Sequence, residues 1–143
     1  MSETASTEIL WIGRFTGPKG ELAEQIMRQV APAFAQVKFT MVGGPLTVAL
    51  QHDLPANVEL TGFVEDVRPY LQRASAVIGA GRVALEALQA GKPILAVGEN
   101  VYHGWIDDTT IDAARASNFG DCDQRHAIDM QRFRADIKRF IDA

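Results

Sequence analysis

Residues 79–93 read GAGRVALEALQAGKP, and this stretch decides the fold more clearly than any other in the chain. Glycines come directly after the short apolar run 75–78, and a helix pattern with Glu86 in its second turn follows them. Such a start leaves the first helical amides uncovered, where an anion is favoured. Another apolar run, 93–97, comes next, as expected of strands in a buried parallel sheet. The glycines therefore form either an anion-binding loop or a plain tight turn between two core elements.

A second junction between a strand and a helix is expected near the amino end. The apolar run 9–12 leads into residues 13–20, GRFTGPKG, and then into a helix whose apolar residues fall on one face. This loop has neither the Walker spacing nor the dinucleotide pattern GxGxxG. It does carry Arg14 and Lys19, two cations that suit a diphosphate held by charge-assisted hydrogen bonds. The alternative is that both are ordinary solvated surface cations.

Strand and helix patterns alternate along the chain. Strands separated by helices indicate parallel pairing with right-handed crossovers, so we expect an α/β fold with a Rossmann-like doubly wound parallel sheet. In open sheets of this kind, ligands bind at the carboxyl ends of the strands, near a reversal of strand order. The expected strands are 9–13, 38–43, 58–62, 76–79 and 93–97. The expected helices are 20–36 with a bend or end at Pro32, 46–52, 67–73, 82–90, 110–116 and 124–141.

Length and composition indicate one small domain. The 143 residues are 47% hydrophobic, which is enough for a single core. We expect a disordered polar leader at residues 1–7 and one domain at 8–143. The leader lacks the pattern of a signal peptide, and no run reaches the roughly 18 to 20 apolar residues of a membrane span. A cytoplasmic location without a transmembrane segment is therefore expected.

Charge and cysteine content narrow the classes of ligand. The formal net charge of −4 gives no basic field, so neither nucleic acid nor an anionic membrane is expected as a partner. Cys122 is the only cysteine, which excludes an intramolecular disulfide and a cysteine-based zinc cluster. Asp121, Cys122, Asp123 and His126 lie close together but match no ligand spacing of a metal site. We expect no metal there and interpret the segment as a polar turn.

Four motifs in fixed order carry a family resemblance. They are GRF at 13–15 with KG at 19–20, FTMVGGP at 39–45, NVELTG at 57–62 and LEALQAGKP at 85–93. Together, over residues 9–97, they resemble the carboxy-terminal, donor-binding lobe of retaining group 1 glycosyltransferases of the GT-B type. The resemblance implies a single Rossmann-like, nucleotide-sugar-binding lobe of a hexosyltransferase, which takes part in transfer from a nucleotide diphosphate sugar to an acceptor hydroxyl. It also implies that no metal or cofactor is needed.

The resemblance also implies roles for individual residues. Arg14 and Lys19 would contact the diphosphate and Glu86 the ribose, whereas the alternative for Glu86 is an ordinary solvent-facing helix glutamate. No catalytic residue is identified, although His103 is a candidate for proton transfer against the alternative of a surface loop histidine. The remaining implied contacts are the amides of Gly81, Arg82 and Val83 to the diphosphate, Gly62, Phe63 and Val64 flanking the base, and Gly79 at the sugar. Glu99 and Asn100, in the loop after the fifth expected strand, are candidate polar contacts to the sugar because the ends of parallel strands converge there.

Two departures from the family pattern bear on function. The family commonly has a second glutamate, which touches the donor sugar, eight residues before the ribose ligand, and here Ile78 stands at that position. A GT-B enzyme also has two lobes with its site between them, and this chain has room for one. We therefore expect a fragment of a longer enzyme, a natural half that needs an acceptor-binding lobe in trans, or a protein that has ceased to be an enzyme.

Two other functions remain open. A non-catalytic nucleotide-sugar-binding or interaction module is consistent with Ile78 and with the single lobe. A nucleotide-sugar epimerase would need a pair of carboxylates for acid and base catalysis, which the sequence does not show. A nicotinamide dehydrogenase is disfavoured because no acidic residue ends a second strand after a GxGxxG loop.

Overall fold

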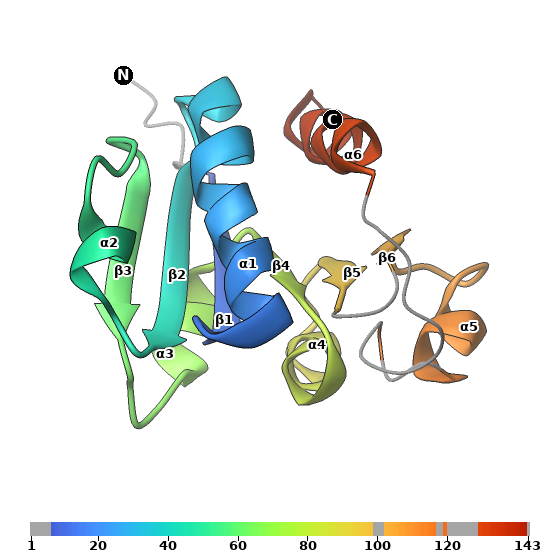
Figure 1. Cartoon of the computed structure of the whole chain (residues 1–143). Helices are drawn as coiled ribbons and strands as arrows, with labels where there is room; N and C mark the ends of the chain where they lie inside the picture. Colours follow the sequence, from blue (N-terminus) through green and yellow to red (C-terminus); the bar gives the residue numbers. More distant parts are fainter. Residues whose placement is uncertain (1–6, 99–101, 117–118, 120–128, 143) are drawn as a thin grey trace, which may run out of the picture.

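The computed structural model describes residues 7–98, 102–116, 119 and 129–142. Within these residues, six strands form one sheet in the order β3-β2-β1-β4-β5-β6 (Figure 1). The first five strands run parallel, and β6 runs antiparallel to β5. The chain leaves β1 toward β2 and β3 and returns on the other side of β1 as β4, so the strand order reverses between β1 and β4. The predicted α/β, Rossmann-like doubly wound fold is confirmed.

The five predicted strands are confirmed to within one residue at each end. The strands are β1 (Glu8–Arg14), β2 (Lys38–Gly44), β3 (Val58–Gly62), β4 (Ala76–Gly79), β5 (Ile94–Val97) and β6 (Tyr102–Trp105). The helices in the described residues are α1 (Gly17–Gln25), α2 (Val48–Gln51), α3 (Arg68–Arg73), α4 (Gly81–Gln89), α5 (Ile111–Ala116) and α6 (Met130–Asp142). A π-helical turn, η1 (Ile26–Val30), and a 3-10 turn, η2 (Ala31–Phe34), continue α1.

Several predicted boundaries were wrong. The first helix begins three residues before Gly20, because Gly17 has φ 65° and turns the chain into the helix there. The helix does change at Pro32, as expected, because this residue lacks an N–H and the chain tightens to a 3-10 turn, but it ends at Phe34 rather than at residue 36. The helix predicted at 46–52 is shorter, spanning the four residues of α2. The start predicted at residue 124 for the last helix lies outside the described residues.

Strand β6 was not predicted. It is a four-residue edge strand that contains Gly104, a residue that strands disfavour. Its pairing with β5 is irregular between Ala96 and Val97. The strand therefore depends on its neighbour in the sheet, a long-range contact that local residue preferences do not reveal.

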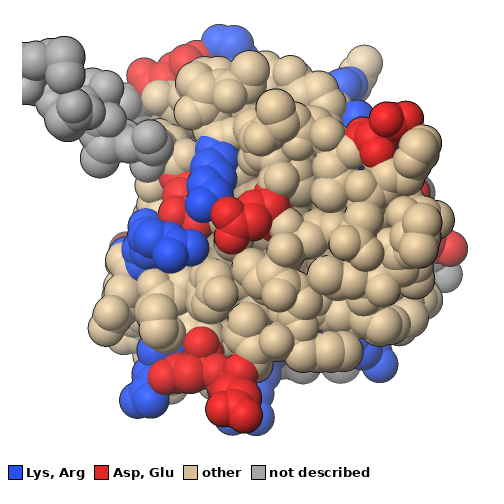
Figure 2. Space-filling view, turned by 90° about the vertical axis from the view of Figure 1, so that its left-hand side faces the viewer, with Lys and Arg blue, Asp and Glu red and all other residues tan. Residues whose placement is uncertain are grey.

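Helices cover both faces of the sheet, because side chains of a strand alternate between the faces. On one face, Ile9 and Trp11 of β1 pack with α1, η1 and α6, including Phe133 (Figure 1). On the other face, Leu10 packs with α3, α4 and α5. On the side of the molecule that Figure 2 shows, basic and acidic side chains lie next to one another. No helix in the described part of the chain combines the length and apolarity required to cross a bilayer.

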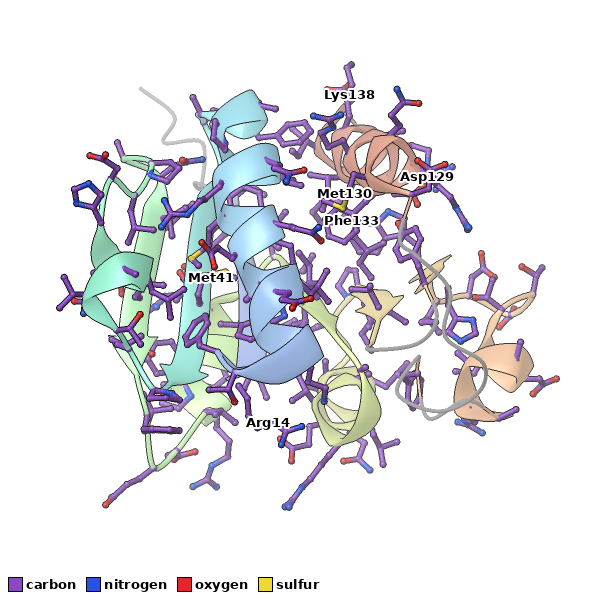
Figure 3. The ribbon with its side chains drawn as sticks, in the orientation of Figure 1. Arg14, Met41, Asp129, Met130, Phe133 and Lys138 are labelled. Carbon is purple, nitrogen blue, oxygen red and sulfur yellow. The ribbon has the colours of Figure 1, made fainter. Side chains whose placement is uncertain are left out.

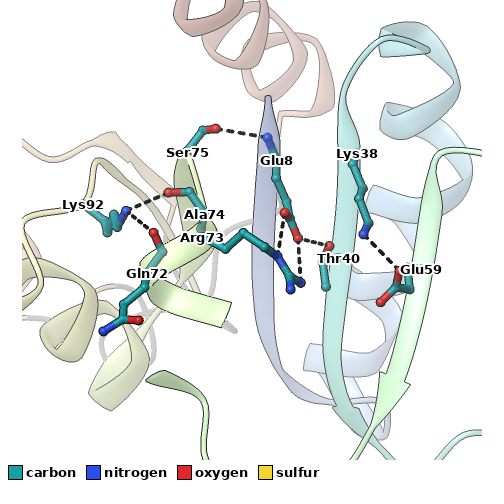
Figure 4. A network of polar contacts seen from close by, with 9 residues as sticks. All are labelled: Glu8, Lys38, Thr40, Glu59, Gln72, Arg73, Ala74, Ser75 and Lys92. Atoms are coloured by element: carbon teal, nitrogen blue, oxygen red, sulfur yellow. Dashed lines mark hydrogen bonds and ion pairs between the residues drawn. The ribbon is translucent and has the colours of Figure 1, made fainter. Parts of the chain in front are cut away.

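A polar network fixes the amino ends of the strands (Figure 4). The buried Glu8 carboxylate accepts a hydrogen bond from Thr40 Oγ1 at 2.6 Å and from Arg73 Nε and Nη2 at 3.0 and 3.2 Å. Burial by itself raises the pKa of Glu8. The hydrogen bonds from Arg73 and Thr40 and the charge of Arg73 lower the pKa by more than burial raises it, so the pKa lies below its ordinary value. Lys92 Nζ donates to the carbonyl oxygens of Gln72 and Ala74, which ties the end of α3 to the turn before β5.

We predict that Glu8→Gln lowers the free energy of unfolding at pH 7 by about 1–3 kcal/mol, because the buried network loses its negative charge and an NH2 donor replaces one of its two acceptor oxygens. The folded pKa of Glu8 is depressed, so the carboxylate's contribution is present above its unfolded pKa near 4.5 and is lost as pH falls through the folded pKa. Denaturant unfolding at pH 7 and at acid pH should therefore show the gap between wild type and variant closing at acid pH.

The matched control is Glu59→Gln. Its carboxylate pairs with Lys38 at 3.0 Å but is 49% exposed, so its removal should cost less than about 1 kcal/mol. A Glu8→Gln cost as small as that of Glu59→Gln would contradict the assigned role of the network.

Candidate functional site

The carboxyl ends of β1 and β4 lie side by side at the reversal of strand order. Trp11 of β1 is in register with Ile78 of β4, and each strand leads directly into a helix. Figure 1 shows the amino ends of α1 and α4 at the end of the sheet toward which the strand arrows point. A small hollow between these elements is lined by Trp11, Ile12, Lys19, Leu22, Gly79, Ala80 and Val97. The two predicted anion-binding loops therefore meet at one place.

The amino end of α4 presents backbone amides without a cap. A single extended residue, Ala80, separates β4 from α4, and its side chain has no hydrogen-bond acceptor. The N–H of Ala84 donates to the carbonyl oxygen of Ala80 at 3.4 Å. The N–H groups of the three residues before Ala84 have no intrahelical acceptor, and the first turn of α4 holds no acidic residue. Such a helix start is compatible with an anion, and the diphosphate contacts of Gly81, Arg82 and Val83 stay a prediction.

The loop between β1 and α1 is held by close backbone packing. The N–H of Phe15 donates to the carbonyl oxygen of Gly44 at 3.0 Å, which extends the pairing of β1 with β2 beyond Arg14. A Cβ at Gly20 would lie 2.4 Å from the carbonyl carbon of Phe15, so only glycine fits there. Lys19, next to Gly20, is half-buried in the wall of the hollow. Packing thus fixes the backbone that carries Lys19.

Arg14 lies at the same end of the sheet. Its side chain is exposed at the last position of β1. Figure 3 shows Arg14 at the carboxyl ends of the strands, whereas Lys138 of α6 lies at the opposite end of the molecule. Lys19 therefore lines the hollow, whereas Arg14 lies at the same end of the sheet without lining it, and their contact with a diphosphate stays a prediction.

The predicted base-flanking loop follows β3. Gly62 has φ 77°, and Phe63 after it is 76% exposed. A Cβ at Gly44 would lie 2.8 Å from the Phe63 ring, so this ring rests on the backbone at the end of β2. Val64 packs instead against the core on the α4 side of the sheet. Phe63 therefore offers an open aromatic face and Val64 does not.

The predicted ribose ligand, Glu86, lies on α4 beside an arginine. Arg82 Nε donates to Glu86 Oε1 at 2.9 Å across one helical turn, and the side chains are 90% and 35% exposed. Glu86 is thus neither buried nor an isolated surface carboxylate. The contact between these two side chains was missed by sequence reasoning, although their spacing of four residues on a predicted helix is a recognisable signal.

The next positions are the candidate sugar contacts and Ile78, which stands where the family commonly has a glutamate. Ile78 is fully buried inside β4, where it packs on the α1 side of the sheet. Gly79 is also buried, and a Cβ there would lie 3.0 Å from Val83 Cγ1. Glu99 and Asn100 lie outside the described residues. The backbone of Gly79 lines the hollow, but no side chain at position 78 can reach a ligand without leaving the core.

His103 and the segment considered for metal binding complete the predicted set. His103 is half-buried in β6, next to Tyr102. The hydroxyl of Tyr102 donates to Asp136 of α6, and burial together with this hydrogen bond raises the pKa of Tyr102. Within residues 7–98, 102–116, 119 and 129–142, no three His, Cys, Asp or Glu residues gather as metal ligands. Asp121, Cys122, Asp123 and His126 lie outside those ranges.

Sequence reasoning did not single out the strand residues that line the hollow. Trp11, Ile12 and Val97 stand near the carboxyl ends of β1 and β5 and form its apolar wall. Their position at strand ends was the available signal, since ligands bind at this edge of parallel sheets.

The sequence of this chain matches a known protein family. Residues 6–114 match the family described as "Glycosyl transferases group 1". The chain belongs to this family. Its fold corresponds to one lobe of a GT-B glycosyltransferase.

Relatives of known sequence are much longer than this chain. An uncharacterized glycosyltransferase of Methanosarcina acetivorans is 39% identical over 62 residues, which cover 41% of this chain and 16% of that protein. Another, from Methanosarcina mazei, is 36% identical over 78 residues, which cover 50% of this chain and 21% of that protein. The chain therefore matches only about a fifth or less of the length of these curated relatives.

The solved structures that match this chain are also much longer than it is. S. aureus TarM, crystallised as a point mutant with fondaparinux, alpha-GlcNAc-glycerol and UDP, superposes with a TM-score of 0.68 at 18% identity, covering 97% of this chain and 29% of TarM. The spinosyn rhamnosyltransferase SpnG superposes with a TM-score of 0.64 at 25% identity, covering 99% of this chain and 38% of SpnG. The predicted single GT-B lobe is thus confirmed as a fold.

We predict that Gly20→Ala destabilises the chain by about 1–3 kcal/mol, because the new methyl overlaps the backbone of Phe15 and a well-packed backbone cannot yield cheaply. Gly17→Ala is the control within the same loop. Gly17 needs only its positive φ and has nothing within 4 Å of a built Cβ, so its substitution should cost about 1–2 kcal/mol through backbone strain. Chemical denaturation measures both.

The two variants should also differ in which backbone amide signals change. Gly20→Ala should alter the backbone amide signals of residues 15–20 in NMR spectra, whereas Gly17→Ala should confine its changes to the helix start. Wild-type stability of Gly20→Ala would overturn the packing assigned to this loop.

Proposed function

We propose that this chain is the donor-binding lobe of a hexosyltransferase that transfers a sugar, with retention, from a nucleotide diphosphate to an acceptor hydroxyl. An acceptor-binding lobe, in cis or in trans, would complete the enzyme. The observation that carries the proposal is the meeting of α1 and α4 at the reversal between β1 and β4, with Lys19 in the wall of the hollow between them. Membership of the group 1 family supports it.

The diphosphate would lie across the amino ends of the two helices. Uncapped amides of α4 donate hydrogen bonds, and Arg14 and Lys19 supply positive charge. These groups are held before the ligand arrives, so they would stabilise the negative charge that grows on the leaving diphosphate. Glu86 would accept hydrogen bonds from the ribose, and the exposed ring of Phe63 would face the base.

A metal ion is not part of the proposed mechanism. The negative charge that a divalent cation balances at other diphosphate sites is here met by Arg14, Lys19 and the helix amides. The chain's own residues therefore bind and orient the donor and stabilise its leaving group, and the nucleotide sugar is the substrate.

The second candidate is the non-catalytic nucleotide-sugar-binding or interaction module, in the form that recognises the nucleotide without a contact to the sugar. The burial of Ile78, where the family commonly has a sugar-binding glutamate, favours it. The candidates differ in whether the sugar is held. A nucleotide sugar bound several-fold more tightly than its nucleoside diphosphate favours the donor lobe, and equal affinities favour the module.

We predict that one of UDP, GDP and ADP binds saturably in isothermal titration calorimetry. Arg14→Ala and Glu86→Ala should each weaken that binding about tenfold, because each removes a charge-assisted contact. Arg134→Ala, an exposed arginine on α6, is the control for loss of one positive charge and should leave the affinity unchanged. A folded wild-type chain that binds none of the three would overturn the proposed function.

We also predict that adding EDTA changes the nucleotide affinity by less than about twofold, because fixed cations and amides meet the diphosphate charge. The same titrations repeated with excess Mg²⁺ and with EDTA measure this. A tenfold loss of affinity in EDTA would show that a metal ion takes part in donor binding.

A further inference from the structure

Arg82 and Glu86 are joined by a single hydrogen bond between their side chains. One guanidinium nitrogen, Nε, meets one carboxylate oxygen, Oε1, at 2.9 Å. In the described part of the chain, neither side chain makes another hydrogen bond or ion pair. Two guanidinium nitrogens and one carboxylate oxygen are thus left side by side on the first two turns of α4.

Two other arginine–carboxylate pairs show the contrast. Arg73 uses Nε and Nη2 on the two oxygens of Glu8, and Arg68 does the same with Asp66. Such two-point contacts engage both carboxylate oxygens and hold the two planes together. The one-point contact of Arg82 leaves donors and an acceptor for a third group. The exposure of 90% for the Arg82 side chain leaves room for that group.

Resting on the proposed function, we propose that the Arg82 guanidinium binds the donor diphosphate while it holds Glu86, and so couples recognition of the phosphates to recognition of the ribose. A nucleoside diphosphate carries both complements in one molecule, since its ribose hydroxyls donate to a carboxylate and its phosphates accept from a guanidinium. Arg82 is second in α4, where the uncapped amides already favour phosphate.

Charge supports this role. A carboxylate at Glu86 repels a diphosphate nearby, and the guanidinium of Arg82 neutralises it at a distance of 2.9 Å. With Arg82 in place the charge of Glu86 is cancelled, and Arg14 and Lys19 lie at the same end of the sheet. Without Arg82 one positive charge is lost beside the phosphates. Arg82 therefore acts both directly on phosphate and through Glu86.

A double-mutant cycle tests the proposal. Calorimetry with UDP, GDP and ADP first identifies the nucleotide that wild type binds, and that nucleotide is then titrated into Arg82→Ala, Glu86→Gln and the double variant. We expect a loss of about tenfold for Arg82→Ala and a combined loss at least threefold smaller than the product of the single losses. Arg82→Lys should bind with intermediate affinity, because lysine restores the charge but not the planar fork.

The other outcomes of these titrations contradict either the coupling alone or the proposed function as well. Wild-type affinity in Arg82→Ala, or single losses that multiply in the double variant, would overturn the coupling while leaving the proposed function intact. Absence of nucleotide binding by wild type would overturn both. Arg134→Ala controls for net charge, and thermal denaturation of every variant separates lost contacts from lost folding. A merely structural pair on the surface of α4 would change stability slightly and binding not at all.

Discussion

The structure depends on strand β1 being paired on both sides with parallel neighbours. It pairs with β2 along its whole length, Glu8–Arg14, and with β4 over Ile9–Trp11, so β1 is held from both sides over its first half. Near its carboxyl end the backbone of β2 comes so close that a Cβ at Gly43 would lie 1.9 Å from the oxygen of Gly13. This packing sets the positions from which α1 and α4 begin.

The short turn between β4 and α4 then determines what kind of ligand fits. Because only Ala80 separates strand from helix, position 78 remains inside the sheet, and its side chain packs in the core. Backbone amides, which need no side chain, are therefore the part of this turn that can meet a ligand. This turn consequently suits an anionic group such as a phosphate, and under the proposed function discrimination of the sugar would come from side chains elsewhere.

The sequence predicted what depends on local pattern. Apolar runs located the five parallel strands, and glycine-bearing loops located Arg14, Lys19 and the start of α4. Features set by long-range packing were not predicted: β6 exists through its pairing with β5, and Gly20 is required by the backbone of Phe15. The contact between Arg82 and Glu86 depends on side-chain conformations that spacing permits but does not impose. The role of Glu99 and Asn100 stays a prediction.

The two ends of the sheet differ in whether their polar groups have hydrogen-bond partners. At the amino ends, the Glu8 carboxylate is buried and fully paired by Thr40 and Arg73, which stabilises the fold and leaves nothing for a ligand. At the carboxyl ends, the amides of α4 lack a cap and Arg82 makes only a one-point contact. Unsatisfied groups of this kind cost stability. A fold whose central strand is paired on both sides and anchored at its far end tolerates that cost, and an anion bound as proposed would offset it.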